Sequence, residues 1–553
     1  MMKKKTKLVA LTLASVFALG GLTACGGRKN EGNEEIVDDG KTINVRISKA
    51  GYGTDYIYKL KEKFEQIYAD EGYKVNVLVP LSGLGETYAY QQIYSDTGID
   101  VFFCGQPFTE QYFDEYGMVF ADLTDTVYNQ QPIKLDGTME EHSVASKIEN
   151  LQYENTYDGK YYGVPYAFTV SGLGVNTKVL QEFDLEIPRT TNELFACTEK
   201  IMSEVTETGV YPFTYSLAGN NYLAIYYRMW LAQLRGYDGL QEFWSMQDLE
   251  TGANLEKPYE VFNGDFEEVL TEFIRMMDYN TAAYGASTQD FKTAQQQFMQ
   301  GDAVFYSVGD WAYNEEKIRN ESKLNDVTIV RVPVISALGT KMFGEETTYG
   351  YDAQKCEQIL CAIIDGVDAN KEASVITSEV NAALSVSLNE TDVLEVCKRV
   401  AFVTGNTDTV TAVVSAKSKV QDIAALFLRM IASDDGAALI AQETLTANPF
   451  NLNALADYES AWHQSTAKRI SNRYMKQIPQ FATGYRKQMG LTTLTPYTGD
   501  FVQTKVLELE LTRYDNNKLT PIKEISIFAD AAKTMSETIY MNAKDAWEKG
   551  QWK

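Results

Sequence analysis

Apolar and polar positions alternate along the chain in a strand, helix, strand order. Residues 42–47 place apolar side chains at every second position, as in a β-strand, and residues 55–69 place them at the spacing of an amphipathic helix. Further apolar strands are expected at residues 74–80 and 99–105. This alternation predicts an α/β fold in which helices cover a parallel or mixed sheet.

A second α/β unit is predicted after residues 158–175, which are rich in Gly, Pro and aromatic residues and indicate a crossover between lobes. Thr191 is expected to cap the first helix of this unit. The other elements expected are a strand at 211–216, helices at 223–236, 265–279 and 288–300, a strand at 410–415, and helices at 419–433 and 525–547. Residues 333–405 are less regular and rich in small residues, which favours an insertion or an elaborated hairpin.

Several polar residues follow the predicted strands, where open α/β sheets bind their ligands. Tyr52 and Gln106 follow the first and third strands of lobe one. Asn220, Asn221 and Tyr222 follow the strand at 211–216, in a Gly-Asn-Asn turn whose polarity suits hydroxyl contacts or simply suits a turn. These positions are candidate ligand contacts.

The N-terminus has the layout of a secretory signal, with a basic start, an apolar run at residues 8–19 and the ending Leu-Thr-Ala-Cys25. The apolar run is too short to span a bilayer core of roughly 30 Å. The ending resembles the lipobox of bacterial lipoproteins, which implies removal of residues 1–24 and lipidation of Cys25. Residues 25–41 are then a flexible tether that holds the protein at the extracytoplasmic face of a cell membrane, and we expect a Gram-positive surface. The alternative is an ordinary signal with a chance cysteine.

Composition narrows the choice of function. A chain of 553 residues is long enough for two or three domains, and 76 acidic against 50 basic residues give a net charge of −26. Such acidity argues against nucleic acid and anionic lipid surfaces as partners. The two histidines, His142 and His463, lack the spacing of a zinc site, so no metal and no cofactor are expected.

Cysteine usage does not indicate a disulfide framework. Apart from Cys25 the chain has an odd number of cysteines without regular spacing: Cys104, Cys197, Cys356, Cys361 and Cys397. A pairing of Cys356 with Cys361 stays open.

Four segments in this order resemble the family 1 extracellular solute-binding proteins of bacterial ABC importers, which are maltose-binding-protein-like. The segments are YDGKYYGVPY ending at Tyr166, GLGVNTK from Gly172, QFMQGDAVF from Gln297 leading into Gly309-Asp310-Trp311, and AKSKVQDIAALF from Ala416. The resemblance implies a two-lobed periplasmic-binding-protein-like fold of type II, with hinge crossings and a central ligand cleft. Residues 333–405 depart from the family pattern.

The resemblance also implies how the chain divides. Lobe one comprises residues 42–167 and returns at 410–450, whereas lobe two comprises 170–405, with the insertion 333–405, and 455–553. The implied protein is a monomer that passes its ligand to the membrane permease subunits of an ABC importer.

Within the implied cleft, Trp311 matches the position where the family often has a stacking platform, and a core-packing role is the alternative. Asp310 beside it could accept hydroxyls, and Tyr166 lies at the first crossing. Sugars present hydroxyls and flat C–H faces, so a sugar site needs aromatic rings beside polar groups. With 35 Tyr and 6 Trp, the chain can supply the rings. Trp230, at apolar helical spacing, is expected in the core.

The sequence therefore predicts a lipid-anchored receptor that binds a carbohydrate, expected to be an oligosaccharide, and that is not an enzyme. No pair of carboxylates is singled out by spacing, and the chain has no G-x-S-x-G elbow or Gly-rich phosphate loop. A peptide-binding receptor of an ABC importer is the main alternative. A cell-surface glycoside-processing enzyme or an adhesin is less favoured.

Overall fold

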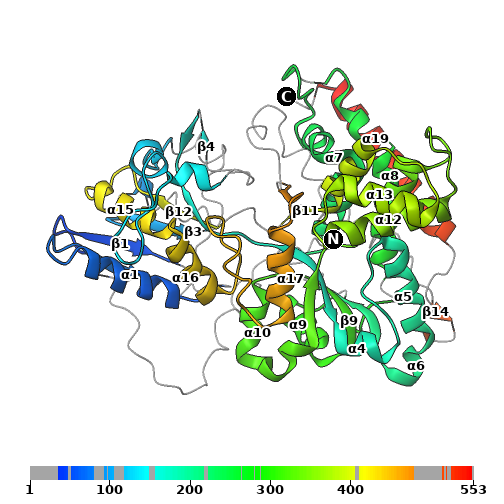
Figure 1. Ribbon diagram of the computed structural model, residues 1–553, viewed down its shortest axis with the longest axis horizontal. Helices are drawn as coiled ribbons and strands as arrows, with labels where there is room; N and C mark the ends of the chain where they lie inside the picture. Colours follow the sequence, from blue (N-terminus) through cyan, green and yellow to red (C-terminus); the bar gives the residue numbers. More distant parts are fainter. Residues whose placement is uncertain are drawn as a thin grey trace, which may run out of the picture.

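The computed structural model of the chain forms two α/β lobes side by side (Figure 1). It describes residues 35–47, 52–79, 93–95, 97–104, 117–148, 156–157, 159–216, 222–253, 255–262, 264–278, 281–286, 288–404, 410–478, 514–515, 518–519 and 525–550. The α/β class expected from the alternating pattern is confirmed.

Lobe one is built on a five-stranded sheet in the order β2-β1-β3-β12-β6. β1, β2 and β3 are parallel, and β12 runs antiparallel to both β3 and β6. Its strands are β1 (Thr42–Arg46), β2 (Lys74–Leu78), β3 (Val101–Cys104), β6 (Val164–Ala167) and β12 (Val410–Val414). β12 comes from a part of the chain far from the other four strands, so the chain enters this lobe twice.

Helices from both passages of the chain through lobe one belong to this lobe. They are α1 (Asp55–Ile67), α15 (Gln421–Ile431) and α16 (Asp434–Thr444), with the short helices η1 (Thr124–Tyr128) and η2 (Val144–Lys147) and the hairpin of β4 (Thr156–Tyr157) and β5 (Lys160–Tyr161). α1 buries Phe64, whose ring meets Phe427 of α15 edge-on with centroids 5.3 Å apart. The helix predicted at 419–433 thus joins the helix predicted at 55–69 in one apolar core.

Lobe two is built on a mixed sheet in the order β10-β7-β9-β8. β7 pairs antiparallel with both β10 and β9, and β8 runs parallel to β9. The strands are β7 (Ser171–Asn176), β8 (Tyr211–Thr214), β9 (Ala303–Gly309) and β10 (Val327–Val330). Gly174 of β7 has no room for a side chain, because a Cβ there would press on Val308 and Phe298. The glycines of the GLGVNTK segment therefore let the central strand pack closely.

Some helices of lobe two cover the faces of this sheet, and others form the upper part of the lobe (Figure 1). They are α4 (Thr177–Glu182), α5 (Thr191–Ser203), α6 (Val205–Thr208), α7 (Ala224–Ser245), η3 (Pro258–Phe262), α8 (Asp265–Met276), α9 (Phe291–Gln300), α10 (Ala312–Asn320), η5 (Glu321–Asp326), α17 (Ala461–Ile470) and α19 (Ile525–Glu548). Two short strand pairs complete it: β11 (Phe402–Val403) with β13 (Lys476–Gln477), and β14 (Tyr514–Asp515) with β15 (Lys518–Leu519).

The predicted cap of α5 is wrong by one residue. Thr190, with an extended backbone, accepts a hydrogen bond from the amide of Glu193 and is the N-cap. Thr191 is the first helical residue, and its hydroxyl instead accepts from the amide of Ser336 at 3.1 Å. Two neighbouring threonines give the same capping signal, and only the tertiary partner separates them.

The expectation of a hairpin at residues 333–405 is also wrong. This segment forms four helices that pack on one another and on α7: α11 (Ala337–Phe343), α12 (Ala353–Asp368), α13 (Ala373–Leu384) and α14 (Glu390–Val400). A Cβ on Gly366 would press on Ile376, and one on Gly339 would press on the Cys356 backbone. The small residues that suggested irregular structure are thus those that let the helices approach closely.

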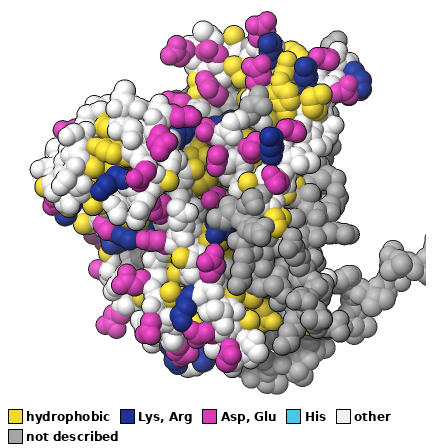
Figure 2. Space-filling model, turned by 90° about the vertical axis from the view of Figure 1, so that its right-hand side faces the viewer, with side chains coloured by type: hydrophobic (Ala, Val, Ile, Leu, Met, Phe, Trp, Pro, Cys, Tyr) yellow, Lys and Arg dark blue, Asp and Glu magenta, His cyan; other side chains and the backbone are white. Residues whose placement is uncertain are grey.

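Cys197, Cys356, Cys361 and Cys397 are buried free thiols, so Cys356 and Cys361 do not pair. Trp230 is fully buried, as expected, and its indole N–H donates to the Pro333 carbonyl at 2.9 Å. Among the helices described, none has both the length and the apolar character needed to cross a membrane. Acidic side chains are spread over the face shown in Figure 2, and Lys and Arg stand mostly singly among them.

Candidate functional site

The two lobes are joined where β6 of lobe one runs into β7 of lobe two. The amide of Phe168 donates to the Ala447 carbonyl at 2.9 Å, and the amide of Ser171 donates to the Thr404 carbonyl at 2.8 Å. Backbone hydrogen bonds therefore tie together three segments that are far apart in the sequence. Phe168 and Ser171 lie within the crossing expected near residues 165–171, whereas Thr404 and Ala447 each come one residue before the crossings expected near 405–412 and 448–455.

Asn448 locks one of these crossings to the sheet of lobe one. Its side chain is fully buried, donates to the Tyr166 carbonyl at 2.8 Å and accepts from the Phe450 amide at 2.9 Å. A buried amide that satisfies two backbone groups fixes the course of the chain after α16.

Asp310 lies at the same place from the side of lobe two, directly after β9. Its amide donates to the Val170 carbonyl at 3.0 Å, and its carboxylate accepts a long hydrogen bond of 3.4 Å from the Ala447 amide. The side chain is fully buried, and burial raises its pKa to about 7, whereas hydrogen bonds from the Val170 and Ala447 backbone and the charge of Arg469 act in the opposite direction. The expectation that Asp310 accepts ligand hydroxyls directly does not fit this burial, because the carboxylate has no exposed surface.

Trp311 follows at the start of α10, and its ring folds back over Gly309. A side chain on Gly309 would overlap the indole, which explains the Gly-x-Trp spacing. The indole is 6% exposed and meets the Tyr222 ring at a steep angle, with centroids 5.2 Å apart. Tyr222 lies just before α7, so two segments of lobe two bring these aromatic rings together.

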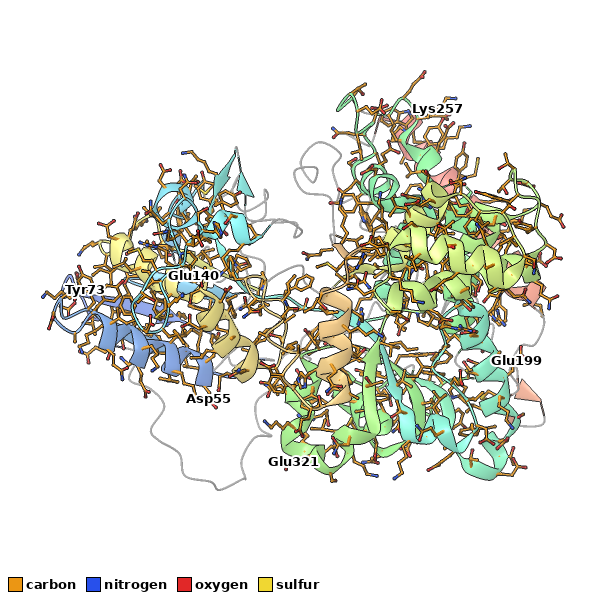
Figure 3. All side chains as sticks on the ribbon, in the orientation of Figure 1. Asp55, Tyr73, Glu140, Glu199, Lys257 and Glu321 are labelled. Carbon is orange, nitrogen blue, oxygen red and sulfur yellow. The ribbon has the colours of Figure 1, made fainter. Side chains whose placement is uncertain are left out.

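Tyr52 is the lobe-one residue that interacts electrostatically with these lobe-two side chains. It precedes α1, whose first residue Asp55 lies at the end of the helix nearer lobe two, as Figure 3 shows. Burial raises the pKa of the Tyr52 hydroxyl, and the charges of Asp310 and Glu315 raise it further. Tyr52 itself is half-buried. A lobe-one hydroxyl therefore lies within electrostatic reach of two lobe-two carboxylates.

Glu315 is a member of this cluster that the sequence did not single out. It lies in the first turn of α10 and accepts a hydrogen bond from the Gln295 side chain at 2.8 Å. Burial raises the pKa of Tyr222 to about 12, and the charge of Glu315 raises it as well. The signal was present in the sequence: Glu315 comes four residues after Trp311, so in a helix the two lie on one face.

Tyr166 lies deeper in lobe one. Its ring stacks on Tyr56 with centroids 5.8 Å apart and contacts Phe103 at 4.8 Å, and it is 3% exposed. It supports the lobe-one side of the junction from behind. We call Tyr52, Tyr222, Asp310, Trp311 and Glu315 the junction cluster.

The remaining candidates, Gln106, Asn220, Asn221 and Cys25, lie outside the described residues. Their roles stay predictions. Among the described residues no group of three or more His, Cys, Asp or Glu side chains could hold a metal ion.

Several solved structures share this architecture. A chitin oligosaccharide binding protein has 13% identity and a TM-score of 0.52, with 90% of this chain and 99% of that chain covered. The GacH receptor of Streptomyces glaucescens, solved unliganded and with acarbose, has 13% identity and a TM-score of 0.51, with coverages of 90% and 98%. A structure from a study of xylan utilization in Caldanaerobius polysaccharolyticus has 15% identity and a TM-score of 0.52, with coverages of 91% and 99%. Identities this low show the fold alone.

Comparison with curated proteins finds no match. The sequence itself matches the profile of a family described as "Bacterial extracellular solute-binding protein" over residues 59–358, which is more than half of the chain. That match and the two lobes joined by crossing segments agree with the resemblance carried by the four sequence segments. The chain belongs to the bacterial extracellular solute-binding proteins.

Proposed function

We propose that this solute-binding protein captures a carbohydrate, an oligosaccharide in particular, at the junction of its lobes and delivers it to an ABC importer. The observation that carries the proposal is the junction cluster, which brings Tyr52 of lobe one to the rings of Tyr222 and Trp311 and the carboxylates of lobe two. Sugar rings are recognised by this combination, since aromatic faces cover C–H surfaces and oxygen acceptors bind hydroxyls.

The charges favour a neutral sugar. The carboxylates of Asp310 and Glu315 raise the pKa of the Tyr52 hydroxyl, and that of Glu315 also raises the pKa of Tyr222. An anionic ligand beside these two hydroxyls would be repelled by the same carboxylates, so a uronic acid is disfavoured. Binding of a neutral sugar depends little on salt concentration, because screening acts on charged pairs.

The hinge supplies the mechanism. A ligand that contacts Tyr52 of lobe one and Glu315 of lobe two binds better when the lobes close, and only this difference in affinity can shift them. The crossings near Phe168 and Ala447 join the lobes through few backbone hydrogen bonds, which suits rotation about the junction. Closure would present one joint surface to the permease subunits.

The anchor is the second part of the proposal. Lipidation of Cys25 would hold the mature chain at the extracytoplasmic face of the membrane, with residues 26–41 as the tether. In Cys25→Ala the chain should stay as unprocessed precursor or be released into the medium, because acyl chains provide the attachment. Membrane fractions that retain the mature variant would contradict this.

The ligand class is tested by calorimetry of the mature chain against neutral oligosaccharides and, in parallel, against peptides of similar size. We expect heat of binding from at least one oligosaccharide, with affinity nearly constant between low and high salt. Glu315→Gln should weaken that binding, whereas Glu321→Gln, at an exposed position after the same helix, should not. Binding of peptides alone would replace the carbohydrate by the peptide alternative, and turnover of either ligand would indicate an enzyme.

A further inference from the structure

A cavity of about 270 Å³ lies in lobe two, apart from the junction cluster. It is bounded by β10, β11, α12, α14, α17 and the loop before α5, and none of the five cluster residues lines it. β10 and β9 flank β7, so the cavity wall at β10 lies two strands, roughly 10 Å, from β9, the strand that leads into Asp310 and Trp311. Its size is near the lower end of the range of small-molecule pockets.

The charge of the lining is opposite to that of the whole protein. Four cationic side chains line the cavity, namely Arg189, Arg331, Lys468 and Arg469, against the single lining carboxylate of Asp368, and Arg189 is paired with Glu193 and Asp365 outside the lining. The chain as a whole carries 76 acidic and 50 basic residues. A concave surface lined by one sign of charge concentrates ligands of the opposite sign.

Arg331 is the cation most desolvated by its surroundings. Its side chain is 15% exposed, forms an ion pair with Asp368 and lies 3.4 Å from the Val400 carbonyl. Burial lowers its pKa to about 10, and the charge of Arg469 lowers it further. Two guanidinium groups that repel each other across a cavity are stabilised by an anion placed between them.

Arg469 is held in place by two backbone carbonyls, and the charge of Asp310 partly offsets the lowering of its pKa by burial. It donates to the Ser171 carbonyl at 2.7 Å and to the Val330 carbonyl at 3.3 Å. A Cβ on Gly172 would meet its guanidinium, so Gly172 makes room for it. Its Nε is buried and has no hydrogen-bond partner among the described residues. The described residues therefore leave one donor of this charged group unsatisfied.

The rest of the wall is mostly apolar, with Ser465 and Asn472 as its uncharged polar side chains. Val330, Val367, Val400, Phe402 and Val403 line it, and Ala401 adds a small side chain. Burying a hydrocarbon body against this apolar surface is favourable, whereas an inorganic anion would leave the surface in contact with water. The lining thus combines a cationic part with an apolar part.

We propose that this cavity is a second ligand site, for a small organic anion with a carboxylate or phosphate head and an apolar body. The head binds between Arg331 and Arg469, and the body lies against the valines and Phe402. β11 leads directly into Thr404, whose carbonyl accepts from Ser171 at the crossing, so the site adjoins the hinge.

The probe is hexanoate, with hexanol as its uncharged match and inorganic phosphate as a head without a body. Calorimetry and thermal melting are done with the full mature chain. We expect hexanoate to bind and to raise the melting temperature at millimolar concentration, with hexanol and phosphate each weaker by about tenfold, because each loses one half of the contact. No binding of hexanoate, or equal binding of phosphate or hexanol, would overturn the proposal.

Two variants of the Arg331–Asp368 ion pair should change the affinity for hexanoate in opposite directions. Asp368→Asn should tighten hexanoate binding severalfold, because the ligand no longer competes with Asp368 for Arg331. The double variant Arg331→Gln with Asp368→Asn should weaken it about tenfold without leaving a lone buried charge. Equal affinity in both variants would contradict the assigned head position.

Two further variants separate this site from the junction and from nonspecific effects. Ala401→Leu should fill the cavity and abolish hexanoate binding while leaving oligosaccharide binding intact. Lys398→Gln, an exposed cation on the neighbouring α14 that does not line the cavity, is the matched control and should leave hexanoate binding unchanged. Retained binding in a folded Ala401→Leu protein, verified by circular dichroism, would place hexanoate elsewhere and overturn the proposal.

Discussion

The indole of Trp311 occupies the space in which Gly309 would carry a side chain. Gly309 is the last residue of β9, and Trp311 precedes α10, so the chain turns at Asp310 and folds the ring back on the strand it has just left. The ring is then held between that strand and Tyr222. One glycine thus determines where the largest side chain of the junction cluster lies.

Gly309→Ala should displace the indole. Inserting a methyl group into a filled space typically costs about 1–3 kcal/mol in the free energy of unfolding, and here the same change moves a ring of the junction cluster. We therefore expect both a lower melting temperature and weaker oligosaccharide binding. Gly350→Ala, with a positive φ of 67° but no atom within 4 Å of the added Cβ, is a control for backbone strain alone. An unaltered affinity in Gly309→Ala would show that the ring position does not matter for the ligand.

Trp311→Ala should lower stability and affinity together. The ring is 6% exposed, so its removal leaves a cavity at a cost of about 3–5 kcal/mol, and the loss of a stacking surface costs roughly ten- to hundredfold in affinity. Trp230→Phe is the control, because Trp230 is fully buried in the core of lobe two and its indole donates to the Pro333 carbonyl. It should lose stability and keep affinity. If Trp311→Ala behaves in the same way, Trp311 belongs to the core and not to the site.

Sequence patterns predicted the elements with strong periodicity best. The helix expected at 525–547 is α19 (Ile525–Glu548), and the strand at 410–415 is β12 (Val410–Val414). Residues 333–405 were misread because small residues such as Gly366 indicate a loop in isolation, whereas here they allow helix packing. Only the tertiary partner, Ile376, distinguishes the two cases.

The candidate site was predictable in kind but not in detail. Tyr52, Tyr222 and Trp311 were reachable, because strand ends and a family-like segment mark them. The burial of Asp310 was not, since it depends on Val170 and Ala447, which lie far away in the sequence.

Asn448→Ala should destabilise the hinge side of lobe one. The change leaves the Tyr166 carbonyl and the Phe450 amide without their side-chain partner in a buried place, at a cost of roughly 1–3 kcal/mol. Urea unfolding of the variant and the wild type measures this loss in the free energy of unfolding. Asn451→Ala, whose side chain donates to the Asp434 carbonyl at a solvent-exposed contact, should cost well under half as much. Equal losses would mean that burial of the Asn448 amide does not decide the effect.

The buried cysteines should be reactive only after unfolding. Cys197, Cys356, Cys361 and Cys397 are buried free thiols, and burial raises the pKa of Cys361 and of Cys397 to about 12, so little thiolate forms near neutral pH. A thiol reagent should label them slowly in the native protein and rapidly in denaturant. A reductant should leave the melting temperature unchanged, and a drop on reduction would reveal a disulfide.

Asp310 should make stability depend on pH. Burial raises its pKa from 3.8 to about 7, so between these values the folded state holds a proton that the unfolded state has lost. The stability that this bound proton contributes is therefore fully present below about pH 4. It is lost as the pH rises towards about 7, and the loss is at most about 4 kcal/mol.

Asp310→Asn removes this proton equilibrium and keeps an acceptor for the Ala447 amide. We expect the free energy of unfolding of the variant to increase relative to that of the wild type as the pH rises from about 4 to about 8. The range stays below the pKa of Arg469, which burial lowers to about 10, so its charge is constant. Urea unfolding at several pH values measures the difference, with the exposed Asp302→Asn as a control that should run parallel to the wild type. If the Asp310→Asn curve also runs parallel, Asp310 is ionised throughout and its buried charge is matched by Arg469.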